Sequence, residues 1–90
     1  MKEIILPPFG ITDTEKKTAL YLLQDLTVKQ ITELRHISFE GVQSQTKRIR
    51  SKMYATTIQG ALARMIAVGI IHEEELLLCL PKDWIDRRVI

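Results

Sequence analysis

The chain has 90 residues, of which 46% are apolar and 27% charged, a composition that fits one small globular domain and excludes a disordered chain. The net charge of +2 excludes a uniformly basic protein, yet residues 41–72 contain no acidic residue and five basic ones: Lys47, Arg48, Arg50, Lys52 and Arg64. Such a basic block predicts a surface that faces a polyanion, or a helix face that only keeps the protein in solution.

Threonine and serine residues that can cap helices mark where the helices begin. In three places a threonine precedes a glutamate or glutamine by three residues, which is the spacing of a capping box. These pairs are Thr12 with Glu15, Thr27 with Gln30, and Thr56 with Gln59. Ser38 is a fourth candidate cap, without a box because residue 41 is glycine. Together with the apolar periodicity that follows, the caps predict helices at residues 13–24, 28–34, 39–53 and 57–68.

Each predicted helix has apolar residues at helical spacing, which define the expected core. The residues expected to face inward are Ala19, Leu20, Leu22, Leu23, Ile31, Leu34, Val42, Thr46, Ile49, Met53, Ala61, Leu62, Met65 and Ile66. Gly69 follows the last helix, where glycine commonly ends one. Pro7 and Pro8 exclude a helix through residues 1–10, and the apolar residues 76–80 predict a short helix or a short strand. The predicted fold class is all-α.

The second and third predicted helices are joined by a corner of about four residues, which is typical of a helix-turn-helix. The third helix has an apolar stripe on one side. Its other side holds polar and basic residues: Gln43, Ser44, Lys47, Arg48, Arg50 and Ser51. In a helix-turn-helix such a face enters the major groove, where cations neutralise phosphates and shorter polar side chains reach base edges.

In the same register, residues 11–71 resemble the LuxR-type (GerE-like) DNA-binding domain without a gap. That family has a Leu-Thr-x-x-Glu opening, a Gly-Leu-Ser/Thr corner and a Lys-Glu-Ile-Ala segment, then Ile-Ser, Thr-Val and Ile-x-x-Lys-Leu around its recognition helix, and a closing Gly-Leu/Ile-Ile. The matching segments are Ile11-Thr12-Asp13-Thr14-Glu15, Asp25-Leu26-Thr27, Lys29-Gln30-Ile31-Thr32, Ile37-Ser38, Gly41-Val42, Ile49-Arg50-Ser51-Lys52-Met53 and Gly69-Ile70-Ile71. The resemblance implies a four-helix bundle within a single domain of residues 1–90, with a short extended N-terminal segment and a C-terminal extension at residues 72–90.

The sequence departs from the family's pattern at several positions. These are Thr32 for a small alanine, Arg35 for a leucine, His36 for the corner glycine, Gly41 within the recognition helix, and Gln43 and Gln45 for frequent lysine and histidine. His36 predicts either a left-handed backbone or a slightly different turn. The base-reading pattern of the family therefore does not transfer unchanged.

The resemblance also implies the roles of individual residues in a stand-alone, cytoplasmic transcription regulator. The base-facing residues would be Gln43, Ser44, Lys47 and Arg48. Phosphates would be bound by Thr27, Lys29, Ser38, Arg50 and Lys52, of which the threonine and serine are also expected helix caps. The fourth helix commonly pairs two copies in this family, and here that surface would comprise Ile58, Leu62, Met65, Ile66 and Ile70. The expected partner is double-stranded DNA bound by a homodimer, with no cofactor, metal or catalytic residue.

A second interpretation keeps the helix-turn-helix shape but assigns it to binding another regulator or RNA polymerase, as an antagonist. It rests on the departures in the recognition helix and on the apolar residues 76–80 and Trp84, beyond the family's usual end. A region-four domain of a sigma factor is similar in pattern, but the closing Gly-Ile-Ile favours the LuxR type. An enzyme is the weakest class, because there is no glycine-rich phosphate loop, metal-ligand spacing or Ser/His/Asp set.

Several remaining residues have more ordinary interpretations. Cys79 is the one cysteine, which excludes a disulfide within the chain, suits a reducing compartment and predicts a small buried apolar group. Trp84 either packs on the bundle or anchors a partner. No stretch free of charge is long enough to span a bilayer, and no signal-peptide segment opens the chain, so we expect no contact with a membrane.

Overall fold

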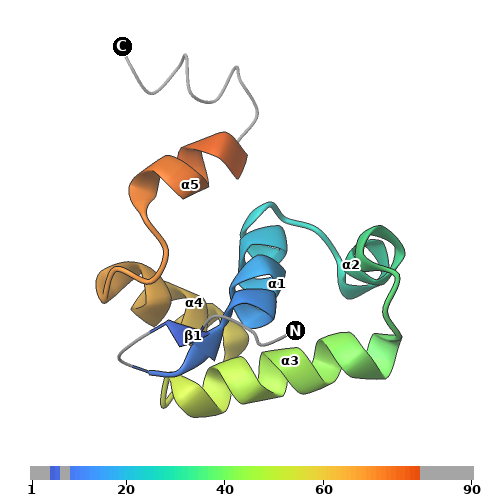
Figure 1. Ribbon diagram of the computed structural model, residues 1–90, viewed down its shortest axis with the longest axis horizontal. Coiled ribbons are helices and arrows are strands. Elements are labelled where there is room, and N and C mark those ends of the chain that lie inside the picture. The colour runs from blue at the N-terminus through green and yellow to red at the C-terminus, as the bar shows by residue number, and fades with distance from the viewer. Residues whose placement is uncertain (1–4, 7–8, 80–90) are drawn as a thin grey trace.

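The computed structural model describes residues 5–6 and 9–79, and within them the protein is mostly helical (Figure 1). A pair of two-residue strands comes first, followed by five helices. The elements are β1 (Ile5–Leu6), β2 (Ile11–Thr12), α1 (Asp13–Leu23), α2 (Val28–Arg35), α3 (Phe39–Lys52), α4 (Ile58–Ala67) and α5 (Glu73–Cys79). The first four helices lie at the predicted places. For the apolar residues near the C-terminus the sequence predicted a short helix or a short strand, and residues 73–79 form a helix.

Local capping explains where α1 and α2 begin. The Thr12 hydroxyl accepts from the Glu15 amide at 3.1 Å while the Glu15 carboxylate accepts from the Thr12 amide at 2.9 Å, so the predicted box is complete. Thr27 and Gln30 form the same box at the start of α2. An N-cap of this kind stabilises a helix by about 1 kcal/mol.

The start of α4 differs from the prediction by one residue. Thr57, not Thr56, is the N-cap, and its hydroxyl accepts from the Gly60 amide at 3.0 Å. A box cannot form from this residue because the third helical position is glycine, which has no side chain to return the bond. At the other end of α4, Gly69 adopts a φ of 83° and donates to the Ile66 carbonyl, which confirms the predicted glycine terminus.

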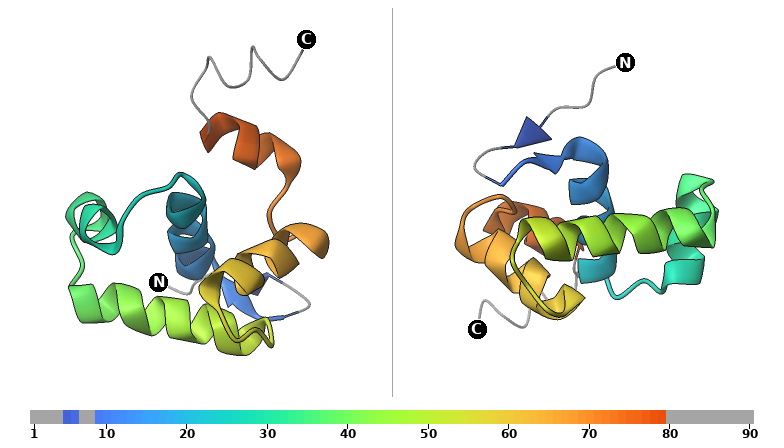
Figure 2. Two further views of the ribbon diagram at one scale, coloured as in Figure 1. Left: turned by 180° about the vertical axis from the view of Figure 1, so that it is seen from behind. Right: turned by 90° about the horizontal axis from the view of Figure 1, so that it is seen from below.

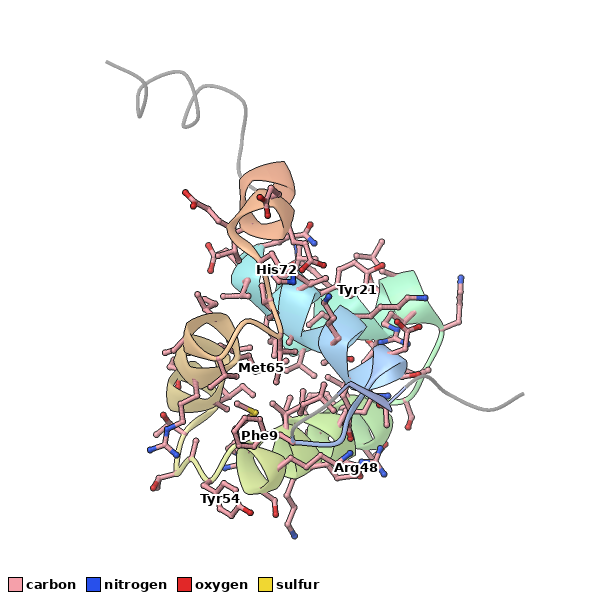
Figure 3. The ribbon with its side chains drawn as sticks, turned by 60° about the vertical axis from the view of Figure 1, so that its left-hand side comes forward. Phe9, Tyr21, Arg48, Tyr54, Met65 and His72 are labelled. Carbon is pink, nitrogen blue, oxygen red and sulfur yellow. The ribbon has the colours of Figure 1, made fainter. Side chains whose placement is uncertain are left out.

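In the N-terminal segment, the described residues Ile5 and Leu6 are extended and pair with the chain that follows them. Strands β1 and β2 are antiparallel, with Ile5 opposite Thr12 and Leu6 opposite Ile11. Phe9, in the turn between them, meets Tyr54 edge to face at a centroid distance of 6.5 Å (Figure 3). Since Tyr54 directly follows α3 and its C-cap residue, this contact joins the hairpin to the far end of the longest helix.

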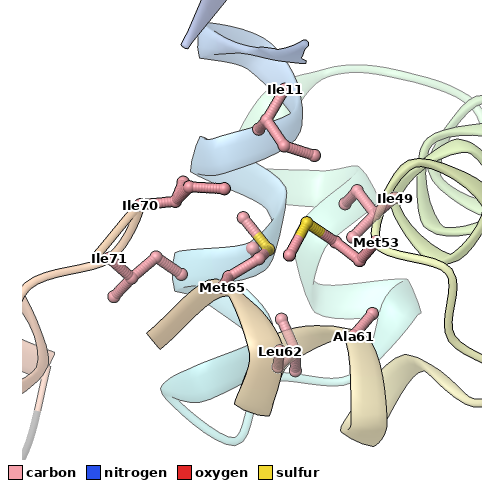
Figure 4. Packing of buried hydrophobic residues seen from close by; sticks show 9 residues of the cluster. Ile11, Ile49, Met53, Ala61, Leu62, Met65, Ile70 and Ile71 are labelled. Carbon is pink, nitrogen blue, oxygen red and sulfur yellow. The ribbon is translucent and has the colours of Figure 1, made fainter. Parts of the chain in front are cut away.

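The core lies between α1, α3 and α4, with β2 closing one side (Figure 4). Its buried members are Ile11, Ala19, Ile49, Met53, Ala61, Leu62, Met65, Ile70 and Ile71. Each fully buried isoleucine or methionine of this set stabilises the fold by about 1.5–3 kcal/mol relative to an exposed side chain. Two residues predicted to face inward do not: Leu34 is 56% exposed and Ile66 38% exposed, because no described element packs over their sides of α2 and α4.

The arrangement leaves α3 along one edge of the molecule. It runs below α1 in Figure 1, and in the view from below it lies in front of the other helices (Figure 2, right). Helix α5 packs on α1, where Lys16 and Glu75 form an ion pair at 2.9 Å. Within the described ranges, no helix is long and apolar enough to cross a bilayer.

Candidate nucleic-acid interface

A three-residue corner, residues 36–38, connects α2 to α3. His36 ends α2 with φ 54° and ψ 41°, so it adopts the left-handed backbone that was one of the two alternatives for this position. Ser38 then caps α3, its hydroxyl accepting from the Gly41 amide at 3.0 Å. The left-handed backbone of His36 ends α2, and the Ser38 cap begins α3. Together these two local features define the turn between the helices.

The outer face of α3 is exposed along the helix. The four predicted base-facing residues, Gln43, Ser44, Lys47 and Arg48, all lie on it. A shallow hollow of about 410 Å³ follows this face and is lined by Glu40, Gln43, Ser44, Thr46, Lys47 and Arg50. Within the part of the chain that the structure describes, no ion pair involves Lys47 or Arg50. These two cations are therefore available to an external anion.

Lys52 has a different environment from the other predicted phosphate ligands. Its Nζ donates to the Glu15 carboxylate at 2.7 Å and to the Gly10 carbonyl at 2.9 Å, and its side chain is only 29% exposed. Arg48 approaches the same carboxylate, with Nε 3.4 Å from Oε2, although its side chain is 59% exposed. Lys52 thus joins α3 to α1 and the hairpin, and binding a phosphate would require it to leave a buried carboxylate.

Glu15 is the anion at the centre of this cluster and is only 2% exposed. Burial alone would raise the pKa of its carboxyl group, but hydrogen bonds from Lys52 and Thr12 and the positive charge of Lys52 outweigh burial and lower the pKa below its usual value. The charged form is therefore the one that the fold stabilises. This ion cluster fixes the C-terminal half of α3 against the start of α1.

A second polar cluster fixes the N-terminal half of α3. The buried Thr18 hydroxyl on α1 donates to the Gln45 side chain on α3 and accepts from Arg35 Nη1 on α2 at 2.9 Å. Arg35 Nη1 also donates to the Thr14 carbonyl at 2.9 Å. Three helices therefore meet at one hydroxyl, and among the described residues no buried side-chain polar atom lacks a partner.

Most of these internal polar contacts were not predicted from the sequence. Glu15 was predicted through the capping box, but not its pairing with a lysine 37 positions away. Gln45 was placed among the departures from the LuxR-type pattern, whereas it is 8% exposed and points inward. The available signal was the spacing, since Gln45 lies three and four residues from Val42 and Ile49, which are both buried.

The remaining predicted phosphate ligands lie at helix starts or on α3. Thr27 and Ser38 are exposed caps whose hydroxyls accept from backbone amides of their own helices. Lys29 is exposed in the first turn of α2, and Arg50 is half-buried on α3. The Ser38 hydroxyl keeps its own proton for an external acceptor, whereas the Thr27 hydroxyl already donates to the Gln30 side chain at 3.3 Å.

The predicted pairing surface on the fourth helix needs correction. Leu62, Met65 and Ile70 are 8%, 0% and 5% exposed, because they pack into the core of a single copy. Ile58 is partly buried, and of the predicted set Ile66 is the most exposed, at 38%. The surface that does exist here is an apolar groove of about 380 Å³ between the end of α1 and α4, lined by Leu22, Leu23, Asp25, Gln59, Leu62, Ala63 and Ile66.

The other residues singled out by sequence have less distinctive surroundings. His36 and His72 are exposed, and the His72 amide donates to the Glu75 carboxylate at 3.0 Å. Hydrogen bonding from this amide lowers the pKa of Glu75, with Lys16 adding to the effect and burial opposing it. Over the described ranges, no group of three or more His, Cys, Asp or Glu could hold a metal ion. The side chain of Cys79 and the whole of Trp84 lie outside the described residues.

Comparison with known proteins finds no matching family model, no similar curated protein and no similar solved structure.

Proposed function

We propose that the protein is a small sequence-specific transcription regulator with a LuxR-type (GerE-like) helix-turn-helix, and that it binds duplex DNA in the cytoplasm. In this proposal α2 supports α3 through the corner at residues 36–38, and α3 enters the major groove. The sequence resemblance over residues 11–71 and the order α1 to α4 support the same assignment.

One observation carries the proposal: the outer face of α3 is exposed, polar and cationic, while its inner face is fixed by two polar clusters. Gln43, Ser44 and Lys47 are all exposed, and Gly41 to Ile71 contain no acid that would repel phosphates. A helix with its side chains is about 10–12 Å wide, which matches a major groove of about 12 Å. Preorganised helices avoid the ordering cost of binding, so the fixed inner face favours docking.

The proposed contacts follow the exposure of each residue. Gln43 and Ser44 would contact base edges, Gln43 with the geometry that pairs an amide with adenine. Lys47 would contact a guanine or a phosphate, and Arg50 and Lys29 would bind phosphates. Lys52 is assigned to the fold instead of the DNA, because its ammonium group is already paired with Glu15.

We further propose that two copies pair through the groove between α1 and α4. The groove is apolar, and Ile66 at its edge is 38% exposed, which favours contact with another protein surface. Two-fold symmetry of the protein would then predict a DNA site with roughly inverted halves.

Titration of duplex DNA at several salt concentrations tests the central proposal. Affinity should fall steeply with salt, because phosphate contacts release counterions. Lys47→Ala and Arg50→Ala should each weaken binding to every duplex and reduce the slope of log affinity against log salt by about one. Lys17→Ala is the matched control, since it removes an exposed cation from α1. An affinity that does not change with salt would contradict DNA binding by this face.

The groove also favours a second candidate function, binding to another regulator or to RNA polymerase. Leu34 and Phe39 support it, since both are at least half exposed on either side of the corner. The two functions differ in whether the outer face of α3 is the binding surface. If a protein partner binds at the groove, Lys47→Ala would leave that binding unchanged, whereas Ile66→Glu would abolish it.

A further inference from the structure

Glu40 occupies an unusual place on the DNA-facing side of α3. The buried residues of this helix are Val42, Gln45 and Ile49, which define its inner face. Because successive residues turn by about 100°, the opposite face is centred on Glu40, Ser44, Lys47 and Ser51. All four are exposed. Glu40 is therefore the first side chain of the outward ridge, at the end of α3 from which recognition helices contact bases.

Glu40 is also the one acidic residue of α3. It lines the same hollow as Gln43, Lys47 and Arg50, so a carboxylate lies beside two cations and an amide on the surface proposed to meet DNA. Of the ion pairs in the described part of the chain, none includes Glu40. No ion pair among the described residues therefore accounts for the charge.

An acid in the first turn of a helix is modestly stabilising, because the backbone amides there carry a partial positive charge. This stabilisation would be similar for an acid at any position of the first turn, so it does not explain why the acid lies on the outward ridge. On a surface that meets phosphates, a carboxylate weakens binding to every duplex unless it faces a hydrogen-bond donor. In the major groove guanine and thymine present acceptors, and adenine presents an acceptor beside its donor, whereas cytosine presents only its N4 amino group.

We propose that Glu40 is a specificity-determining residue, and that its carboxylate accepts a hydrogen bond from the N4 amino group of a cytosine in the major groove. This inference rests on the proposed function. The cytosine lies next to the base pairs contacted by Gln43 and Ser44, because Glu40 lies on the same face one turn before Ser44. The carboxylate selects against the other bases by repelling their acceptors, so it contributes discrimination more than affinity.

The experiment selects bound duplexes from a randomised pool with the full chain, and then measures the affinity of the selected site and of its single-base variants. The unaltered protein should enrich a site that contains a cytosine whose replacement weakens binding by roughly tenfold. Glu40→Ala should remove the preference at that one position while affinity for unrelated duplexes rises. Glu40→Gln, which keeps the size of the side chain, should move the preference toward adenine, since an amide pairs with its N6 and N7.

Glu33→Gln is the matched control, because it removes another exposed carboxylate, which lies on α2. It should leave the preference at every position unchanged. If the unaltered protein enriches a site and Glu40→Ala and Glu40→Gln keep its full base preference, the role of Glu40 is refuted while the proposed function stands. If the unaltered protein enriches no sequence and shows no salt-dependent binding, the proposed function fails, and the inference fails with it.

Discussion

Among the residues that the structure describes, three that are not glycine adopt a left-handed backbone, and each ends a helix or follows its end. They are Asp25, His36 and Tyr54, with φ of 63°, 54° and 54°. Side chains other than glycine disfavour this conformation by about 1 kcal/mol, although aspartate tolerates it better than most. Tyr54 has a compensating contact with Phe9, whereas His36 is exposed and makes no described side-chain contact that would offset the strain.

His36→Gly should therefore stabilise the protein. Relief of the left-handed strain outweighs the greater entropy of glycine in the unfolded chain, and we expect an increase of about 0.5 kcal/mol in the free energy of unfolding. Urea denaturation followed by circular dichroism measures this change. Tyr54→Gly is the comparison, since it relieves the same strain but loses the Phe9 contact. Destabilisation by His36→Gly would show that the imidazole has a structural role at the corner.

Glu15 provides a prediction that depends on pH. Its pKa is lowered in the folded protein, so unfolding makes the carboxylate easier to protonate. The stabilisation is complete above the ordinary carboxyl pKa of about 4.3 and is lost as the pH falls from there through the lowered value. Near neutral pH, Glu15→Gln should reduce the free energy of unfolding by about 2 kcal/mol, because hydrogen bonds to the charged group are lost.

The unfolding free energies of Glu15→Gln and the unaltered protein should converge in acid. Urea denaturation at a series of pH values from about 7 to about 3 measures the difference between them. Glu75→Gln is a useful control, because the pKa of Glu75 is also lowered but its side chain is 30% exposed. If the difference in unfolding free energy between Glu15→Gln and the unaltered protein stays constant with pH, Glu15 stabilises the fold through packing and not through its charge.

At the scale of the helices, sequence reasoning succeeded where the determinants are local. The capping boxes at Thr12 and Thr27 involve residues three apart, so the starts of α1 and α2 could be predicted from spacing alone. The start of α4 was placed one residue early because either of two adjacent threonines can cap it. The links between helices were not predictable in this way. Thr18 and Gln45 are 27 residues apart, and periodicity says nothing about which residues of two helices will meet.

The link through Thr18 also bears on two positions at which the sequence differs from the LuxR-type family that it resembles. Arg35 and Gln45 stand where that family has a leucine and a frequent histidine, and both are bonded to the same hydroxyl. The two departures therefore belong to one internal contact between α1, α2 and α3. Because both side chains bond one buried hydroxyl, the free-energy costs of changing them should not be additive.

Thr18→Val tests this arrangement, because valine has nearly the same shape without the hydroxyl. We expect the free energy of unfolding to fall by about 1–3 kcal/mol, since the buried Gln45 side chain loses its donor. Combining Thr18→Val with Gln45→Leu should cost less than the sum of the two single changes. Thr46→Val is the control, because its hydroxyl bonds only the Gln43 carbonyl of its own helix. Additive costs in the double variant would show that the two side chains do not act together.

At the scale of the whole molecule, the sequence defined the helices better than it defined their exposed sides. Met65 was predicted both to face the core and to pair two copies, and the structure assigns it to the core, where it is 0% exposed. Ile66 was predicted to have the same two roles and is 38% exposed. Adjacent apolar residues on a helix point about 100° apart, and which of them is covered depends on the neighbours that the fold supplies. For the same reason the groove between α1 and α4 had no signal in the sequence.

The proposed pairing surface leads to a prediction about assembly. Ile66→Glu places a charge at the edge of the apolar groove, and burying that charge against a second copy would be unfavourable by several kcal/mol. We expect this variant to remain folded, because the side chain is partly exposed in one copy, but to sediment as a monomer at concentrations where the unaltered protein is a dimer. Its affinity for a two-half site should fall toward that for a single half-site.

Ala67→Glu is a closely matched control, since it adds the same charge to the last turn of α4 at an exposed position that does not line the groove. It should sediment as a dimer and bind DNA as the unaltered protein does. Circular dichroism of both variants separates loss of pairing from loss of structure, because a charge in the last turn of a helix destabilises both equally. If Ile66→Glu still forms dimers, the two copies pair elsewhere, and the groove between α1 and α4 is left for a different protein.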